Sequence, residues 1–223
     1  MLVIGMLLLM PTVTLTHQGT LTESLHGPAR VALAPDGTVL VTDPPNNTIA
    51  RFDAAGVYLG TWSVAEGPLG VAAHPDGRYF VSLRDSAAVA IYDNTFTFTG
   101  YLGAGVVTFV GPGDIAIAND TGVIYVVDAA GDYVYGFAAD GSLVLTLGGR
   151  GGGDGQFRRP NAIAVDVAGS KLLVADQDNF RVQVFTLTGT FVTAFGNRNK
   201  YYGDGSGEGW LPRTQGLAVD SAS

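Results

Sequence analysis

Short apolar runs rich in Val, Ile, Leu and aromatic residues follow one another along this chain, and Gly, Pro, Asn or Asp separates most runs from the next. The runs lack the 3.6-residue period of an amphipathic helix, and several alternate as strands do. They recur in sets that begin at Pro28, Pro68, Pro112, Pro160 and Pro212, which lie 40, 44, 48 and 52 residues apart. Self-similarity at this spacing predicts an all-β fold, a β-propeller in which each set forms one blade.

Each complete set contains four runs of strand length, which we expect to pair as a four-stranded antiparallel sheet. The expected first strands are 30–34, 70–74, 114–118 and 162–166, and the expected second strands are 39–42, 79–83, 124–127 and 172–175. The expected third strands are 49–52, 89–92, 133–137 and 181–185, and the expected fourth strands are 57–62, 97–102, 143–147 and 191–195. Each third strand ends on an aromatic residue, which is well placed to fill the gap between neighbouring sheets.

The sets divide the chain into four full blades and a partial blade at each end. The full blades are expected at about 28–66, 68–110, 112–158 and 160–210, and the partial blades at about 12–26 and 212–223. Residues 12–16 and 20–25 are typical of third and fourth strands, and 216–220 is typical of a first strand. Because a closed propeller hides its sheet edges, we interpret residues 12–223 as a segment of a larger ring. A complete but irregular small propeller is the alternative.

Residues 1–11 form an apolar leader. Its core, 2–10, is too short to span a bilayer as a helix but has the size of a signal-peptide core. No Lys or Arg precedes Arg30 and no small-x-small cleavage site follows, unlike an ordinary export signal. The leader is therefore a signal or its remnant, a buried strand, or the product of a misplaced start codon. We expect no transmembrane span and an extracytoplasmic or secreted protein.

Composition limits the partners. The 223 residues carry 20 acidic and 12 basic side chains, which gives a net charge of −8. Nucleic-acid binders cluster Lys and Arg, whereas here only Arg158-Arg159 and residues 198–200 form small basic groups, so the charge balance argues against a nucleic-acid partner. The sequence contains no cysteine, which excludes disulfides and thiolate metal sites.

One set carries a motif that can be compared with known repeats. Its residues are Gly-Gly-Arg-Gly-Gly-Gly-Asp-Gly-Gln-Phe-Arg-Arg-Pro at 148–160, Ala-Ile-Ala-Val-Asp at 162–166 and Leu-Val-Ala-Asp-Gln-Asp-Asn-Phe-Arg-Val-Gln-Val-Phe at 173–185. This set strongly resembles the NHL repeat, and the sets at Pro28 and Pro112 resemble it moderately. The set at Pro68 is the weakest match, because Val-Ser-Leu at 81–83 replaces Val-x-Asp.

The resemblance implies a six-bladed parent ring and two classes of function. NHL propellers usually act as scaffolds or sensor domains that bind proteins, glycans or RNA. Relatives with similar blades include amidating lyases and metal-dependent lactonases. Function belongs to a site and not to a fold, so the resemblance alone does not choose between these classes.

The enzymatic alternative depends on oxygen-bearing side chains near the starts of first strands. In gluconolactonase-like relatives, an axial divalent metal is held by ligands that include an Asn, an Asp and the Glu of a Glu-Gly-Pro segment. The matching residues here are Glu66, Asp114, which stands one place later than the pattern, and Asn161. Together they could bind Ca²⁺ or another divalent cation. A zinc site is disfavoured, because His17 and His74 stand in predicted turns, where we expect solvated side chains.

An aspartate closes the second strand in three sets. We expect Asp43, Asp128 and Asp176 to accept hydrogen bonds from loop amides, and Arg181 to return beside Asp176. Because the residue recurs from blade to blade, whereas chemistry needs a single copy, we predict a structural role.

Two loops remain. The loop 196–211 mixes aromatic and charged residues, and its candidates for binding a partner are Tyr201, Tyr202, Asp204 and Trp210. The glycine-rich loop 148–155 lacks a Gly-Lys-Ser/Thr ending and precedes a strand, so we predict a flexible connector and no phosphate site.

These observations favour a non-catalytic scaffold that requires no cofactor and binds a protein or a small-molecule or glycan ligand. The alternative is a lactonase-like hydrolase or lyase with an axial divalent metal.

Overall fold

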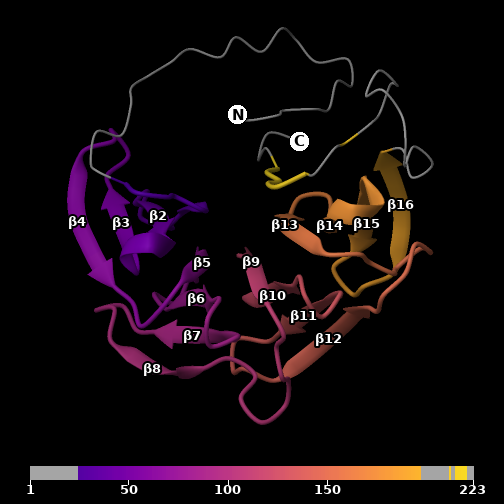
Figure 1. Ribbon diagram of the computed structural model, residues 1–223, viewed down its shortest axis with the longest axis horizontal. Helices are drawn as coiled ribbons and strands as arrows, with labels where there is room; N and C mark the ends of the chain where they lie inside the picture. The colour runs from indigo at the N-terminus through magenta and orange to yellow at the C-terminus, as the bar shows by residue number, and fades with distance from the viewer. Residues whose placement is uncertain (1–24, 197–210, 212–213, 220–223) are drawn as a thin grey trace, which may run out of the picture.

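The structure, a computed structural model, describes residues 25–196, 211 and 214–219. The described residues form four sheets of four antiparallel strands each, without any α-helix. In every sheet, strands that follow one another in sequence pair side by side. The sheets stand around a common centre as the blades of a propeller do (Figure 1). The predicted all-β propeller with four-stranded antiparallel blades is confirmed.

The bounds of the strands follow the repeat. Blade 1 contains β1 (Val31–Leu33), β2 (Val39–Asp43), β3 (Thr48–Phe52) and β4 (Tyr58–Ser63). Blade 2 contains β5 (Pro68–Ala73), β6 (Tyr79–Leu83), β7 (Ala88–Tyr92) and β8 (Phe98–Tyr101). Blade 3 contains β9 (Pro112–Ala118), β10 (Val123–Asp128), β11 (Tyr133–Phe137) and β12 (Leu143–Gly148). Blade 4 contains β13 (Pro160–Asp166), β14 (Lys171–Asp176), β15 (Arg181–Thr186) and β16 (Phe191–Gly196). Short 3-10 turns follow the second strands of blades 1 and 4 at η1 (Pro44–Asn46) and η2 (Gln177–Asn179).

The expected partial blades fall largely outside the described residues. Of 12–26, only residues 25 and 26 are described. The strand expected at 216–220 does not form over its described part, because residues 214–219 pair with none of the described strands.

Aspartate side chains stabilise the hairpin turns. Asp36 Oδ1 accepts the N–H of Thr38 at 2.9 Å in the turn between β1 and β2. Asp53, Asp93 and Asp140 accept an N–H two residues ahead in the turns between third and fourth strands. These local acceptors satisfy amides that the strand ladder leaves unpaired, which explains the recurrence of Asp in the turns.

The hydrophobic core lies between successive blades. Leu40 and Ile49 of blade 1 pack with Val71 and Ala73 of blade 2, and equivalent clusters join blades 2 and 3 and blades 3 and 4. The aromatic residues that end the third strands are buried, as predicted: Phe52, Tyr92, Phe137 and Phe185. Each blade therefore depends on its neighbours for the burial of its sheet faces.

Stacked rings join blades 1 and 2 at their outer rim. Phe96 occupies the turn between β7 and β8 with φ of 61°, at a position where the equivalent turns have glycine, for example Gly141. This left-handed conformation costs a side-chain-bearing residue about 1 kcal/mol. The Phe96 ring stacks on Tyr92 and on Trp62, with centroid separations of 4.2 and 4.1 Å. Stacking between two rings offsets the backbone strain.

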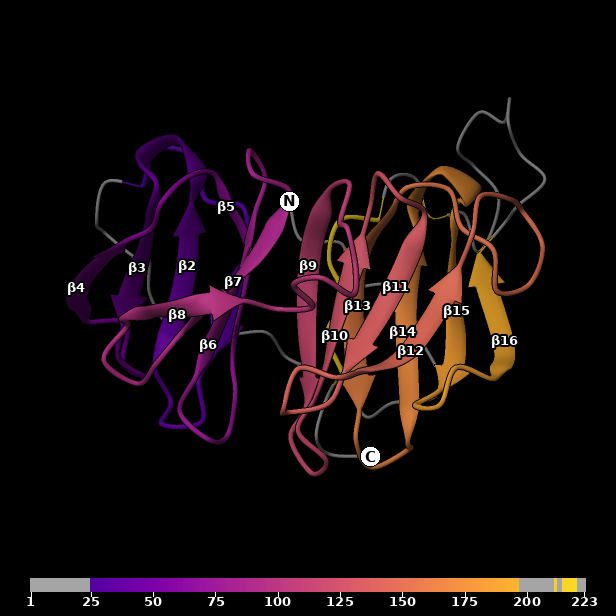
Figure 2. The same cartoon turned by 90° about the horizontal axis from the view of Figure 1, so that it is seen from below.

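Strand direction separates the loops onto two faces, between which the strands run (Figure 2). We call the residues that precede each first strand the lead-in loop. The lead-in loops and the turns after second strands share one face, the lead-in face, and the remaining turns share the opposite face. Over the described ranges, no helix is long and apolar enough to cross a membrane.

Candidate functional site

Residues at the starts of three first strands meet at the centre of the lead-in face. Arg30 Nη2 donates to the carbonyl oxygen of Asn161 at 2.9 Å and to Asn161 Oδ1 at 3.2 Å. Arg30 Nε lies 3.5 Å from Asp114 Oδ1, and Asp114 Oδ2 accepts the N–H of Ile163 at 3.0 Å. A guanidinium from blade 1 thus contacts blades 3 and 4 from within the arc.

Burial controls the charge of Asp114. The side chain is only 16% exposed, and burial raises the pKa of its carboxyl, while the Arg30 guanidinium and the Ile163 amide oppose the rise. A buried carboxylate requires a compensating positive charge, which Arg30 supplies.

The structure places two of the three expected metal ligands near each other. Asp114 and Asn161 both contact the Arg30 guanidinium. Glu66 is half-buried in the lead-in loop of blade 2, and no contact among the described residues joins it to either. In the described part of the chain, His, Cys, Asp and Glu side chains form no metal-binding group of three. A cation that used Asp114 and Asn161 would compete with the guanidinium for their oxygens.

Hydroxyl side chains near the ends of second strands link neighbouring blades close to this centre. Thr42 Oγ1 donates to the carbonyl oxygen of Leu69 at 2.9 Å and accepts the N–H of Arg30 at 2.9 Å. In blade 2, Ser82 Oγ donates to the carbonyl oxygen of Gly113 at 2.5 Å. Each hydroxyl satisfies backbone groups that the strand ladder leaves free at the start of the first strands.

The recurrent aspartate holds the lead-in loop of its own blade. Asp43 accepts the N–H groups of His26 and Gly27 at 3.0 and 2.9 Å. Asp128 accepts the two N–H groups that precede Pro112, at 2.9 and 2.7 Å. A carboxylate is suited to two adjacent amides, because each oxygen accepts one of them.

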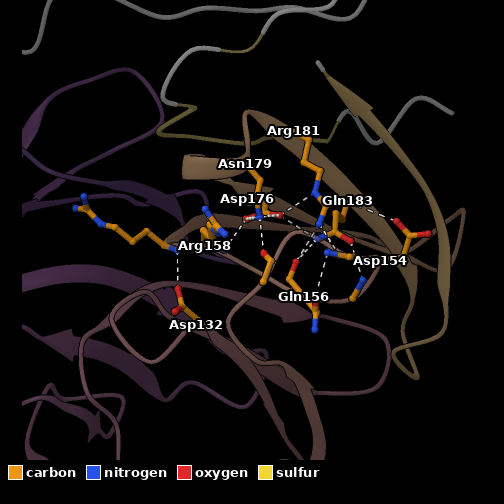
Figure 3. A network of polar contacts seen from close by, with 12 residues as sticks. Asp132, Asp154, Gln156, Arg158, Asp176, Asn179, Arg181 and Gln183 are labelled. Atoms are coloured by element: carbon orange, nitrogen blue, oxygen red, sulfur yellow. Dashed lines mark hydrogen bonds and ion pairs between the residues drawn. The ribbon is translucent and has the colours of Figure 1, made fainter. Parts of the chain in front are cut away.

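Asp176 holds its lead-in loop and also centres a larger network (Figure 3). The fully buried carboxylate accepts the N–H of Arg158 and the Nε–H of Arg181, both at 2.8 Å, and the side-chain amides of Asn179 and Gln183. The pairing with Arg181 expected from the spacing is present. Burial raises the pKa of Asp176, and hydrogen bonds from Arg158 and Arg181 oppose the rise.

The same network holds the glycine-rich loop 148–155, contrary to its interpretation as a flexible connector. Arg181 Nη2 donates to the carbonyl oxygens of Gly153 and Gln156 at 2.7 and 3.0 Å. Gln183 Oε1 accepts a loop N–H at 2.9 Å. Glycine composition alone predicted flexibility, but buried donors on β15 use the loop carbonyls as acceptors.

Sequence reasoning missed a second set of side chains that hold lead-in loops. These side chains connect one blade to the next. Asn47 and Asp132 follow second strands in the left-handed conformation, with φ of 54° and 63°. Asn47 Oδ1 accepts the N–H of Gly67 at 2.8 Å, and Asp132 Oδ1 accepts the N–H of Arg159 at 2.7 Å. Both donors directly precede the proline of the following blade. The available signal was an Asn or Asp, which tolerate this conformation, at the same distance after the second strand.

His74 is buried, at 5% exposed, and not the solvated residue expected. Its Nε2 lies 3.1 Å from the carbonyl oxygen of Gly122, and its Nδ1 lies 2.8 Å from Asp76 Oδ1. Arg78 Nη2 contacts Asp76 at 2.7 Å and donates to the carbonyl oxygen of Ala139 at 2.6 Å. Burial acts to raise the pKa of Asp76, but hydrogen bonds from Arg78 and His74 outweigh it and lower the pKa to about 2. This group clamps blade 2 to two turns of blade 3 on the opposite face.

The binding-loop candidates all lie outside the described residues: Tyr201, Tyr202, Asp204 and Trp210.

Known proteins share both the repeat and the fold. The NHL repeat model matches residues 157–185, the stretch that contains Asp176, Asn179, Arg181 and Gln183. The fourth blade of this β-propeller thus carries an NHL repeat. Protein lin-41 of Caenorhabditis elegans is 46% identical to this chain over 50 residues, which make up 22% of this chain and 4% of lin-41.

Solved structures with the same fold include two lyases and a binding protein. A streptogramin B lyase aligns with a TM-score of 0.62 and 18% identity over 78% of this chain and 56% of its own. A virginiamycin B lyase from Staphylococcus aureus aligns with a TM-score of 0.60 and 14% identity over 75% of this chain and 55% of its own. An auxiliary nutrient binding protein from Bacteroides thetaiotaomicron aligns with a TM-score of 0.69 and 16% identity over 90% of this chain and 56% of its own. The chain thus spans about half the length of these structures, which share its fold.

Proposed function

We propose that this NHL propeller is a non-catalytic scaffold that binds a protein or a small-molecule or glycan ligand on its lead-in face. The observation that carries the proposal is that three carboxylates accept hydrogen bonds from the backbone of the lead-in loops: Asp43, Asp128 and Asp176. These carboxylates fix the loop backbones of three blades, while the loop side chains differ from blade to blade. A rigid frame with variable loop chemistry is suited to recognition.

Exposed charged side chains on this face are available to a ligand. Arg150 and Arg159, before blade 4, are 81% and 69% exposed, and their nearest carboxylates lie 3.6 and 3.9 Å away. Arg84 and Asp85, after β6, are also exposed and pair only with each other in the contacts described. Surface pairs of this kind contribute little to stability, so a ligand can replace them at small cost.

The polar groups at the centre of the lead-in face are occupied with one another. Arg30 donates to Asn161 and lies beside Asp114, and Asp114 also accepts a backbone N–H. General acid–base chemistry needs groups that are directed at a substrate. Mutual pairing supports a role in holding the centre of the propeller together.

A ligand selection with face-specific variants tests the scaffold proposal. The protein would be screened against a displayed peptide library and a glycan array, and each ligand found would be measured on R150A/R159A and on K171A. Lys171 lies at the start of β14 on the opposite face, so K171A removes positive charge at a distance from the proposed surface. We expect at least tenfold weaker binding to R150A/R159A and unchanged binding to K171A. Ligands that show the reverse pattern, or a screen that yields none, would count against the proposal.

The second candidate is a lactonase-like hydrolase or lyase with an axial divalent metal, for which two of the three expected ligands, Asp114 and Asn161, lie around one group, Arg30. Thermal unfolding with Ca²⁺, Mn²⁺ or Zn²⁺ separates it from the scaffold, because a bound metal stabilises the folded state by mass action. A metal site predicts a rise in Tm that N161A abolishes, together with turnover of a lactone. The scaffold proposal predicts neither.

A further inference from the structure

Blade 1 exposes two aliphatic side chains whose equivalents in the other blades are buried or half-buried. Val31 and Leu33 on β1 are 68% and 70% exposed. The residue equivalent to Val31 is Val71 in blade 2, which is 3% exposed, and the equivalents in blades 3 and 4, Ile115 and Ile163, are buried as well. The equivalence follows from the register, since each of these residues pairs with the same position of its second strand.

The internal junctions show what covers this position. Val71 lies in a cluster with Ala34 and Leu40, which belong to the inner part of the preceding blade. Ile115 lies in a cluster with Phe80 of the blade before it. At each junction, apolar residues from the inner strands of the preceding blade therefore cover this position of the first strand.

Val31 and Leu33 lie on the flank of blade 1 that faces away from blade 2. Farther out on this flank, the apolar side chains of β2 and β3 are already covered. Val41, Ala50 and Phe52 lie on this flank and are buried, and Leu25 packs against them. Leu25 is the first described residue, so the chain arrives on this flank from its N-terminal side.

We propose that the apolar run at residues 2–10 docks on Val31 and Leu33 as the missing inner strand of this flank. The run, Leu-Val-Ile-Gly-Met-Leu-Leu-Leu-Met, carries no charge and has the length of a strand. Residues 11–24 can span about 45 Å when extended, and three strand spacings amount to about 15 Å, so the connection reaches easily. The other role open to this run is an export signal, which the mature protein would lack.

Cysteine cross-linking tests the docking directly, because the chain has no cysteine of its own. Leu33→Cys would be combined in the full chain with a cysteine at Val3, Leu7 or Leu9, and mild oxidation followed by mass spectrometry. We expect an intramolecular disulfide in at least one of the pairs. The matched control pairs the same N-terminal cysteines with Val106→Cys, an equally exposed position, 62%, in the loop after β8, where we expect no disulfide.

Deletion of residues 2–10 gives a second readout that tolerates failure of the cysteine variants. We expect a Tm lower by roughly 5–10 °C, from renewed exposure of an apolar flank in a chain of this size. The substitution L33D should lower Tm less in the deleted chain than in the full chain. The proposal is overturned if no pair forms a disulfide, if only dimers linked between two copies form, if the deletion leaves Tm unchanged, or if the mature protein begins after residue 11.

Discussion

Asp176→Asn should destabilise the propeller far more than the equivalent change in the neighbouring blade. Asp176 and Arg181 are both buried and their side chains meet at 2.8 Å. The amide keeps the shape of the carboxylate but removes the charge, and turns N–H groups toward the donors of Asn179 and Gln183. Breaking a buried ion pair from one side typically costs about 3–5 kcal/mol. For a domain of this size the change corresponds to a fall in Tm of roughly 10 °C.

Asp128→Asn is the matched control, because Asp128 accepts only backbone N–H groups in its described hydrogen bonds, from residues 110, 111 and 131. The loss of a charged acceptor for neutral donors should cost about 1–2 kcal/mol. Urea unfolding followed by Trp fluorescence would measure both variants. Adding R181M to each chain completes a double-mutant cycle, in which we expect about 2 kcal/mol of coupling with D176N and close to none with D128N. Two results would refute the idea that the charge of Asp176 holds its lead-in loop. One is an equal loss of unfolding free energy in D176N and D128N, and the other is an effect of D176N and R181M together that equals the sum of their separate effects.

Three further predictions concern the junctions and the centre of the lead-in face. Asp76 has a pKa lowered to about 2, so its stabilising contribution is present above pH 4 and is lost as pH falls toward 2. D76N should abolish about 1 kcal/mol of that dependence, a value reduced for the partial exposure of the side chain. Phe96→Gly should destabilise the fold by about 2 kcal/mol, because the lost ring contacts outweigh the relieved strain, whereas Gly141→Ala, at φ of +86° in open space, should cost about 1 kcal/mol from strain alone. Arg30→Met should destabilise the fold more at high pH than at low pH, because the Arg30 guanidinium stabilises only the ionised form of Asp114, whose pKa burial raises.

Chemical unfolding over a pH series measures all three. The Asp76 prediction fails if the wild type and D76N keep a constant difference from pH 6 to pH 2.5. A stabilising Phe96→Gly would mean that backbone strain exceeds the contribution of the stack. An Arg30→Met effect that grows toward acid pH would reverse the assigned roles of Arg30 and Asp114.

The periodic features of the propeller could be predicted from the sequence because each of them recurs in several blades. The prolines and the aromatic residues that end third strands mark the blades. The aspartates at 43, 128 and 176 mark the hydrogen bonds that hold the lead-in loops. Repetition lets a weak local pattern stand out, since each copy faces the same packing requirement.

The features that escaped prediction occur once or depend on contacts between distant residues. Arg30 meets Asn161 over a separation of 131 residues, and no local pattern encodes that pairing. His74 was expected in solvent because it stands in a turn, but the turns of blade 3 cover it. The glycine-rich loop at 148–155 was expected to be flexible, because composition does not reveal that Arg181 reaches its carbonyl groups.

The contact between Arg30 and Asn161 has a consequence for folding during synthesis. A ribosome that adds about 5–20 residues per second needs on the order of 10 s to make the 131 residues between the two partners. Throughout that interval blade 1 lacks the hydrogen bonds that Arg30 donates to Asn161 in the folded protein. The contact between Arg30 of the first blade and Asn161 can therefore form only after the start of the fourth blade has been synthesised.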